Sequence, residues 1–326
     1  MAGILVVLEQ TGGAWHKMSW ETLAAGQQFG QALGQPVFAT VLGQGIGALA
    51  AELGGKALAK VHAIEHGLLE SYTADGYTAA LAQLIEKNAP SLVLFPHTYQ
   101  VRDFAPKLAT RLGQSLVSDV TRVKIEGSQI TFIRQLFQGK LNADVQASTA
   151  GPHFASIQAG AYRAEDLAAG SAAVETFTPQ LDASMIRQKP EPPFRESARA
   201  VDLTSCDIIV SVGRGIQEAS NIPLVEELAQ ALGGEIAASR PICDNGWLPM
   251  ERQIGSSGQT VSPKVYVAVG ISGAIQHVVG MKGAKAIVAI NKDPNAPIFE
   301  LADYGVVGDL FEILPLLTEE VRKAKA

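Results

Sequence analysis

The chain has 326 residues, which is long enough for two domains that each bury a core of their own. Lys and Arg total 26 against 32 Asp and Glu, for a formal net charge of -6, which excludes a dedicated nucleic-acid-binding protein with its usual basic excess. Cys206 and Cys243 lie far apart and form no CxxC motif, so we expect a reducing compartment and no disulfide framework.

The N-terminal residues MAGILVVLEQ contain an apolar run that is too short for a signal peptide and has no basic lead. No uninterrupted apolar run approaches the length of a membrane span. We therefore expect a cytoplasmic protein without membrane insertion.

Strands and helices alternate along the first part of the chain, which predicts parallel βαβ units. Ser19 is expected to cap the first of these helices, with Glu21 in its first turn. The expected strands are 4–8, 37–42, 61–64 and 92–95, and the expected helices are 19–33, 48–53, 77–86 and 104–112. Strands at 118–125, 130–136 and 143–147, joined by short turns such as Glu126-Gly127-Ser128, predict hairpins instead. The first domain is thus an α/β domain whose mostly parallel sheet carries an antiparallel extension.

The apolar periodicity fades between residues 178 and 200, where the run Gln188-Lys189-Pro190-Glu191-Pro192-Pro193 is unable to continue a helix or a central strand. We place the boundary there and predict two domains, 1–195 and 196–326. The second domain has expected strands at 207–211, 235–238, 265–269, 286–290 and 305–307, with helices at 224–232 and from Ala274. This alternation predicts a doubly wound α/β domain.

Residues 265–281 read VYVAVGISGAIQHVVGM, an apolar strand that enters a glycine-containing turn and a helix. The turn Gly270-Ile271-Ser272-Gly273 lets the backbone approach a ligand, and the free N–H groups at the helix start suit an anion. Gln276 and His277 add side-chain donors. A site for a phosphate-bearing cofactor and an ordinary βα turn both remain open at this point.

Two further segments have the residue types of a binding site. In Gln253-Ile254-Gly255-Ser256-Ser257-Gly258, two glycines bracket two hydroxyls, and Ser239-Arg240 follows a strand, where open α/β sheets bind ligands. A surface loop and a solvated arginine are the alternatives. Gly213-Arg214-Gly215 lacks the third glycine of a dinucleotide fingerprint. No HExxH, Cys/His cluster, GxSxG or P-loop is present, so metal, hydrolase and NTPase readings are not supported.

The stretch 265–281, followed by AIVAINKDPNAPIFELADYGVVGDLF at 286–311, closely resembles the FAD-binding domain of the electron transfer flavoprotein alpha subunit. The resemblance includes SVGRGI at 211–216, Ala238-Ser239-Arg240 and the loop 253–258. In the first domain it includes RDFAPKLATRLGQSLVSDV at 102–120, Gln138-Gly139-Lys140 and Gly160-Ala161-Tyr162. It covers nearly the whole chain.

The resemblance implies one FAD, held mainly by the second domain. Arg240 is expected at the isoalloxazine ring, His277 at its O2 edge, and Ser257 at N5. The familiar family loop is Gly-Gln-Thr-Gly, so Ser257 lacks the threonine methyl that restricts its rotamer. The implied FAD-binding residues are Arg214, Ser239, Arg240, Gln253, Gly255, Ser256, Ser257, Gly258, Gly270, Ile271, Ser272, Gly273, Ala274, Gln276, His277, Asn291 and Asp309; no catalytic residue and no metal ligand is implied.

By the same resemblance the chain forms a heterodimer with an electron transfer flavoprotein beta subunit, which the first domain contacts. It accepts electrons from flavin dehydrogenases, such as the acyl-CoA dehydrogenases of fatty acid β-oxidation, and passes them to a quinone oxidoreductase or a similar acceptor. This is an electron carrier rather than an enzyme with its own substrate, and the second domain is expected to swivel about the linker 178–200. The alternatives are an electron-bifurcating alpha subunit that uses NADH, and a cofactor-free nucleotide-sensing or scaffold protein.

Overall fold

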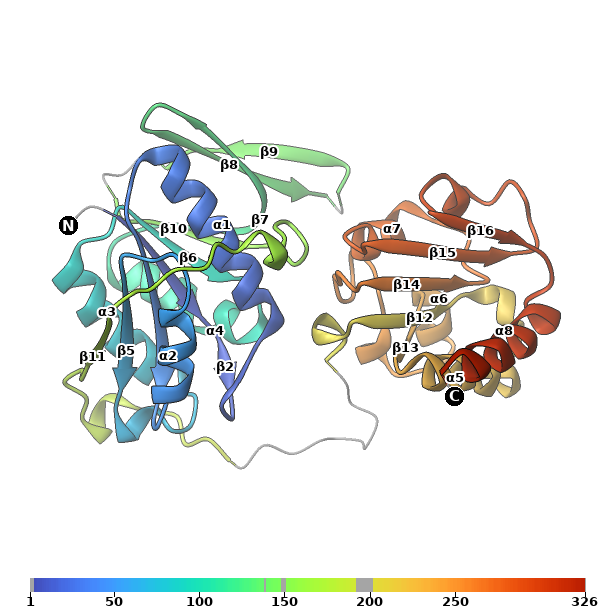
Figure 1. Ribbon diagram of the computed structural model, residues 1–326, viewed down its shortest axis with the longest axis horizontal. Coiled ribbons are helices and arrows are strands. Elements are labelled where there is room, and N and C mark those ends of the chain that lie inside the picture. The colour runs from blue at the N-terminus through green and yellow to red at the C-terminus, as the bar shows by residue number, and fades with distance from the viewer. Residues whose placement is uncertain (1–2, 138, 148–150, 192–201, 326) are drawn as a thin grey trace. The chain divides into compact units, whose positions relative to one another are not determined.

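The computed structural model describes residues 3–137, 139–147, 151–191 and 202–325. The chain folds into two compact units, the first built from residues 1–136 and 141–193 and the second containing residues 194–326 (Figure 1). The predicted boundary between residues 195 and 196 lies outside the described residues and stays a prediction, as does the part of the linker from Pro192 to Ala200.

The first unit is built on a mixed sheet with the strand order β11-β5-β4-β1-β6-β10-β7-β8-β9 among its described residues. Pairing is parallel from β11 to β7 and antiparallel from β7 to β9, which confirms the predicted extension. The strands are β1 (Ile4–Leu8), β4 (Val37–Gly43), β5 (Lys60–Glu65), β6 (Leu92–Pro96), β7 (Leu116–Glu126), β8 (Gln129–Leu136), β9 (Leu141–Val145), β10 (His153–Ile157) and β11 (Val174–Phe177). A separate small hairpin pairs β2 (Gln10–Thr11) with β3 (Ala14–Trp15).

β10 and β11 were not predicted from the sequence. β10 lies between β6 and β7 and is parallel to both, yet its five residues include His153 and Ser156 and give no clean apolar signal. β11 is an edge strand whose side chains are exposed or half-buried, so it lacks the apolar run of the buried strands.

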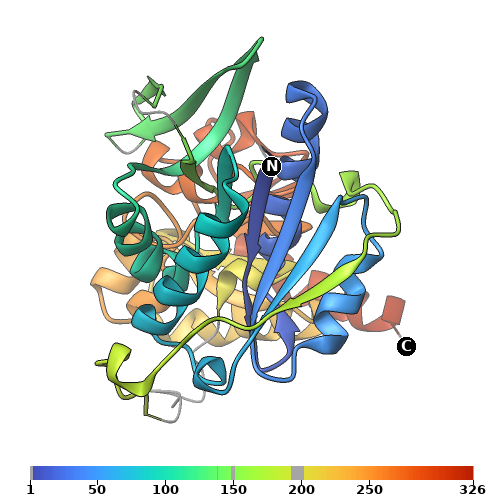
Figure 2. The same cartoon turned by 90° about the vertical axis from the view of Figure 1, so that its left-hand side faces the viewer.

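Helices cover both faces of this sheet, as Figures 1 and 2 show. Side chains of β1 alternate: Ile4 belongs to the core with α1 (Lys17–Leu33) and α2 (Gly47–Gly54), and Leu5 belongs to the core with α3 (Ala74–Asn88) and α4 (Tyr99–Arg111).

One predicted helix cap is wrong. α1 begins at Lys17, and the Nδ1 atom of His16 accepts from the backbone N–H of Met18 at 3.3 Å. Ser19 is instead buried within the helix, where its hydroxyl donates to the carbonyl of Glu9 and accepts from the Glu9 N–H. These two bonds satisfy the backbone N–H and carbonyl groups of Glu9, just after β1. Because Glu9 is distant in sequence from Ser19, the local residue spacing does not predict them.

The second unit has a parallel sheet with the order β13-β12-β14-β15-β16 among its described residues. Its strands are β12 (Ile208–Val212), β13 (Glu235–Ala238), β14 (Val265–Val269), β15 (Ala286–Asn291) and β16 (Tyr304–Val307). α5 (Ile222–Leu232) and α8 (Leu310–Lys325) pack on one face and α7 (Ile275–Met281) packs on the other, as a doubly wound domain requires. The short helix α6 (Arg240–Asp244) was not predicted.

Strand order places a topological switch point in this sheet. The chain moves from β12 outward to β13 and then returns to form β14 on the other side of β12. The loops that follow β12 and β14 therefore diverge at the carboxyl edge of the sheet, where open α/β folds bind ligands.

The segment after β11 is attached to the first unit over much of the predicted linker. Asp75, in the first turn of α3, accepts from the backbone and guanidinium of Arg187 and from Lys107. Gln188 accepts from the N–H of Ala74. The prediction that the linker starts at residue 178 is therefore wrong, because the buried carboxylate of Asp75 and its neighbour Ala74 hold the chain against the first unit as far as Gln188. No helix among the described residues is both long and apolar enough to cross a membrane.

Candidate functional site

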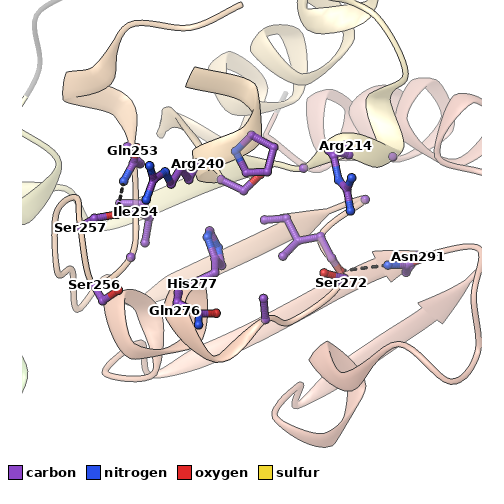
Figure 3. Close-up of a pocket in the computed structure, with 18 of the residues that line it drawn as sticks. Arg214, Arg240, Gln253, Ile254, Ser256, Ser257, Ser272, Gln276, His277 and Asn291 are labelled. Atoms are coloured by element: carbon purple, nitrogen blue, oxygen red, sulfur yellow. Dashed lines mark hydrogen bonds between the residues drawn. The ribbon is translucent and has the colours of Figure 1, made fainter. Parts of the chain in front are cut away.

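A pocket of about 780 Å³ opens at the carboxyl edge of the second sheet, at its switch point (Figure 3). The loops after β12, β13, β14 and β15 and the start of α7 form its walls. It is lined by Gly213, Arg214, Gly215, Gln217, Ser239, Arg240, Pro241, Gln253, Ile254, Gly255, Ser256, Ser257, Gly270, Ile271, Ser272, Ala274, Gln276, His277, Asn291 and Lys292.

Glycines bring two of these loops into backbone contact. A Cβ atom on Gly213 would lie 2.4 Å from the carbonyl oxygen of Gly270, and a Cβ on Gly215 would lie 2.7 Å from the Cα of Gly270. Gly270 itself has φ +60°, a conformation that side chains disfavour. The pocket floor is therefore bare backbone that a ligand can approach closely.

The loop 253–259 is held by hydrogen bonds within itself and to α7. Gly255 (φ +141°) donates to the carbonyl of Gln259, and Ser256 donates its N–H to the carbonyl of Gln276. The side-chain amide of Gln253 donates to Ser257 Oγ at 2.9 Å. Ser257 thus has an acceptor position filled and a hydroxyl proton left to donate.

Several buried polar atoms at the pocket have no hydrogen-bond partner in the described part of the structure: Ser256 Oγ, Gln253 Oε1 and His277 Nδ1. Buried polar atoms are normally paired, so atoms left open at a cavity wall fit a polar ligand. His277 is 6% exposed, and burial lowers its pKa to about 4, so the imidazole is neutral at pH 7.

The charged side chains that line the pocket are all cationic: Arg214, Arg240 and Lys292. Arg240 makes an ion pair with Asp244 along α6, at 3.2 Å from Nε to Oδ2, and both side chains remain more than half exposed. These three side chains give the wall of the pocket a positive charge. Such a wall suits an anionic ligand.

The polar groups divide between two ends of the pocket. In Figure 3, Gln253, Arg240 and Ser257 lie toward one end, and Arg214, Ser272 and Asn291 lie toward the other. Asn291 donates to the carbonyl of Ile271 at 2.9 Å, which ties the end of β15 to the turn after β14. His277 points inward between these groups.

Most of the sequence-predicted site residues line this pocket, and three do not. Gly258 and Gly273 act behind the wall, because a Cβ on either would lie 2.3 Å from a backbone atom, of Gln253 and Ile298 respectively. Asp309 accepts from the N–H of Phe311 and starts α8, and it is not among the lining residues. Its implied contact with FAD stays a prediction.

Six further residues line the pocket and were not predicted from the sequence: Gly213, Gly215, Gln217, Pro241, Ile254 and Lys292. Gln217 has φ +72°, which is a strained value for a non-glycine residue. No feature of the sequence predicted this conformation. Lys292 had a usable signal, since it follows directly on Asn291 at the carboxyl end of a predicted strand. Among the described residues, no group of three His, Cys, Asp or Glu is arranged to hold a metal ion.

Comparison with known proteins gives matches along both units. Residues 4–182 match the electron transfer flavoprotein domain, and residues 202–282 match the electron transfer flavoprotein FAD-binding domain. The electron transfer flavoprotein subunit alpha of Thermoanaerobacterium thermosaccharolyticum is 37% identical, over 99% of this chain and 98% of that protein. The chain belongs to the electron transfer flavoprotein alpha subunit family.

Other relatives have more specific names. Protein FixB of Azotobacter vinelandii is 37% identical, over 97% of this chain and 90% of that protein. The acryloyl-CoA reductase electron transfer subunit beta of Anaerotignum propionicum is 34% identical, over 99% of this chain and 96% of that protein. The family assignment confirms the resemblance found in the sequence.

The cofactor of this family's second domain is FAD, and the pocket fits it. The bare glycine backbone, the three cations and the unpaired buried atoms provide what a diphosphate and a polar ring system need. When bound, FAD supplies the electron-accepting and electron-donating chemistry, and the protein supplies binding, orientation and electrostatics.

Proposed function

We propose that this chain is the FAD-carrying subunit of a heterodimeric electron carrier. It pairs with an electron transfer flavoprotein beta subunit, accepts electrons from flavin dehydrogenases such as acyl-CoA dehydrogenases, and passes them to a quinone oxidoreductase or a similar acceptor. The observation that carries the proposal is the cationic pocket at the switch point of the second unit. The first unit serves as the scaffold that contacts the beta subunit.

The end of the pocket with Arg214, Ser272 and Asn291 is proposed to hold the pyrophosphate and ADP portion. Arg214 and Lys292 compensate the phosphate charges, and the turn 270–273 offers backbone close to them. Ser239 and Gln276 are proposed to orient the cofactor between its two ends, and Asp309 remains a candidate for the adenosine end.

The end with Arg240, Gln253 and Ser257 is proposed to hold the flavin ring. Arg240 places a permanent charge beside the ring and stabilises the negative charge that arrives with an electron. Ser257 donates a hydrogen bond to N5, and the bond from Gln253 restricts its rotation in place of the threonine methyl that it lacks. His277 is proposed to donate to the O2 edge as a neutral imidazole.

The test is to co-express the chain with its beta subunit and to measure bound flavin, followed by electron transfer from a reduced acyl-CoA dehydrogenase. We expect a yellow heterodimer with one FAD that the dehydrogenase reduces. A colourless heterodimer that binds no added FAD would contradict the proposal and would favour the nucleotide-sensing alternative.

A second candidate is the alpha subunit of an electron-bifurcating flavoprotein. It is suggested by the relative named as an electron transfer subunit of acryloyl-CoA reductase, because a reductase consumes electrons and a carrier that serves it needs a donor such as NADH. The number of FAD molecules per heterodimer and the electron donor distinguish the two candidates. Two FAD per heterodimer, with reduction by NADH, would select bifurcation.

A further inference from the structure

A fully buried tyrosine lies directly behind the pocket and makes contact with one of its lining side chains. Tyr266, on β14, is 0% exposed, and its hydroxyl lies 2.8 Å from the Nε2 atom of His277. Tyr266 does not line the pocket, so the proposed FAD contacts give this phenol no role. The other ring nitrogen, Nδ1 of His277, is buried and has no hydrogen-bond partner among the described residues.

The direction of the hydrogen bond decides what His277 can offer to a ligand. A neutral imidazole has one N–H donor and one bare acceptor nitrogen. If Tyr266 donates to Nε2, the proton of the ring must sit on Nδ1. If Nε2–H donates to Tyr266, then Nδ1 is a bare acceptor.

The protonation states of the two side chains and their relative donor strengths favour donation by the tyrosine. Burial raises the pKa of Tyr266, so its hydroxyl keeps its proton, and burial lowers the pKa of His277, so the imidazole stays neutral. A phenol O–H is a stronger donor than an imidazole N–H, and an imidazole nitrogen is a stronger acceptor than a phenol oxygen.

We propose that Tyr266 is a positioning residue that donates its phenol proton to Nε2 of His277 and thereby fixes the tautomer with the proton on Nδ1. That tautomer offers an N–H donor from a buried, preorganised position to the flavin. The inference rests on the proposed binding of FAD in this pocket. It follows the general rule that a histidine's far-side partner sets which nitrogen faces the chemistry.

The tautomer of His277 affects how tightly the reduced cofactor binds. A donor aimed at the ring gains strength as negative charge accumulates there, whereas a bare nitrogen lone pair would repel that charge. Loss of the Tyr266 hydroxyl frees the imidazole to adopt either tautomer. Reduced flavin should then bind about tenfold more weakly relative to oxidised flavin, which for a two-electron couple is a midpoint potential about 30 mV lower.

The first experiment reads the tautomer directly, in the FAD-loaded heterodimer with ¹⁵N-labelled histidine. NMR distinguishes a protonated ring nitrogen from a bare one, and the signals missing from His277→Asn assign those of His277. We expect a protonated Nδ1 and a bare Nε2. A protonated Nε2 in the wild-type protein would overturn the inference, and this measurement does not depend on whether any tyrosine variant folds.

The second experiment compares Tyr266→Phe with Tyr304→Phe. The control removes the same hydroxyl from a tyrosine that is 67% exposed on β16 and does not line the pocket. Only Tyr266→Phe should lower the potential and disturb the His277 signals. Bound flavin with both readouts unchanged in Tyr266→Phe would refute the tautomer inference alone, whereas absence of flavin from the wild-type heterodimer would refute the proposed function itself.

Discussion

The loops after β12 and β14 cross with their backbones in direct contact at Gly215 and Gly270, where the two loops diverge. The N–H of Gly215 donates to the carbonyl of Gly270 at 3.1 Å, and a Cβ on either residue would lie 2.7–2.8 Å from the Cα of the other. The crossing joins two strands' loops at the switch point and forms the floor of the pocket. Its tolerance to a single methyl group is therefore a direct test of the site.

Gly215→Ala is expected to destabilise the second unit by about 2 kcal/mol, because the methyl group meets backbone that has no room to move. Denaturant unfolding and the FAD content of the purified heterodimer measure the effect. Gly47→Ala is the control, since a Cβ there meets nothing within 4 Å. Equal stability and FAD content in the two variants would show that the loops do not meet as described.

Arg240→Ala is expected to lower the midpoint potential of the flavin. A cation about 4 Å from a new negative charge contributes up to ~4 kcal/mol at an effective dielectric constant of about 20, or roughly 170 mV for one electron. Because Arg240 is exposed and paired with Asp244, we expect a fall of a few tens of mV instead. Spectroelectrochemical titration measures it, with Arg240→Lys as the charge-preserving control and Asp244→Asn shifting the potential upward. A potential unchanged in Arg240→Ala would remove this residue from the flavin end.

Lys292→Ala is expected to weaken FAD binding about tenfold at low ionic strength, through the loss of one of the three cations of the pocket. The difference from wild type should shrink as salt is added, because screening weakens an exposed charge pair. Fluorescence titration of flavin-depleted heterodimer measures the affinity. Lys282→Ala, which removes an exposed lysine that does not line the pocket, should bind FAD like the wild type. A loss that is independent of salt would count against a phosphate contact.

Stability of the flavin-free chain should fall in acid because of His277. Its folded pKa is about 4 and its unfolded value is 6.5, so the unfolded state binds more protons between these values. The free energy of unfolding therefore decreases as the pH falls from about 6.5 to 4, by about 3 kcal/mol for this group. Unfolding at pH 7 and pH 4 of wild type and His277→Gln isolates the effect from His62, His97 and His153, whose pKa values burial also lowers. The same acid sensitivity in both proteins would show that His277 is not buried as described.

Asp75→Asn is expected to release the segment that precedes the linker. The 5%-exposed carboxylate of Asp75 binds Arg187 and Lys107, and its replacement by a neutral amide breaks both ion pairs. Trypsin should then cleave at Arg187 about ten times faster, if local opening costs 1.4 kcal/mol less. Asp166→Asn, at an exposed position, is the control. Cleavage at an unchanged rate would mean that the segment is held by other contacts.

The sequence was sufficient for the class of the fold and for the family. Apolar strands of the second unit, such as β14 and β15, are continuous runs because both of their faces are buried, so local composition revealed them. β10 lies inside the first sheet but is short and partly polar, and only its partners β6 and β7 make it a strand. Boundaries such as the start of α1 depended on distant bonds of Ser19 and were misjudged for that reason.

The candidate site was likewise predictable from the sequence only in part. Motifs adjacent along the chain, such as the turn 270–273 with His277, carried the resemblance that implied FAD, because their residues lie within one βα unit. The tertiary structure alone decided that Gly215 reaches Gly270, that Lys292 joins Arg214 and Arg240 at one pocket, and that the phenol of Tyr266 meets His277. The physical reason is strand order: parallel neighbours that are distant in sequence bring their carboxyl ends to one edge of the sheet, and no local pattern encodes that order.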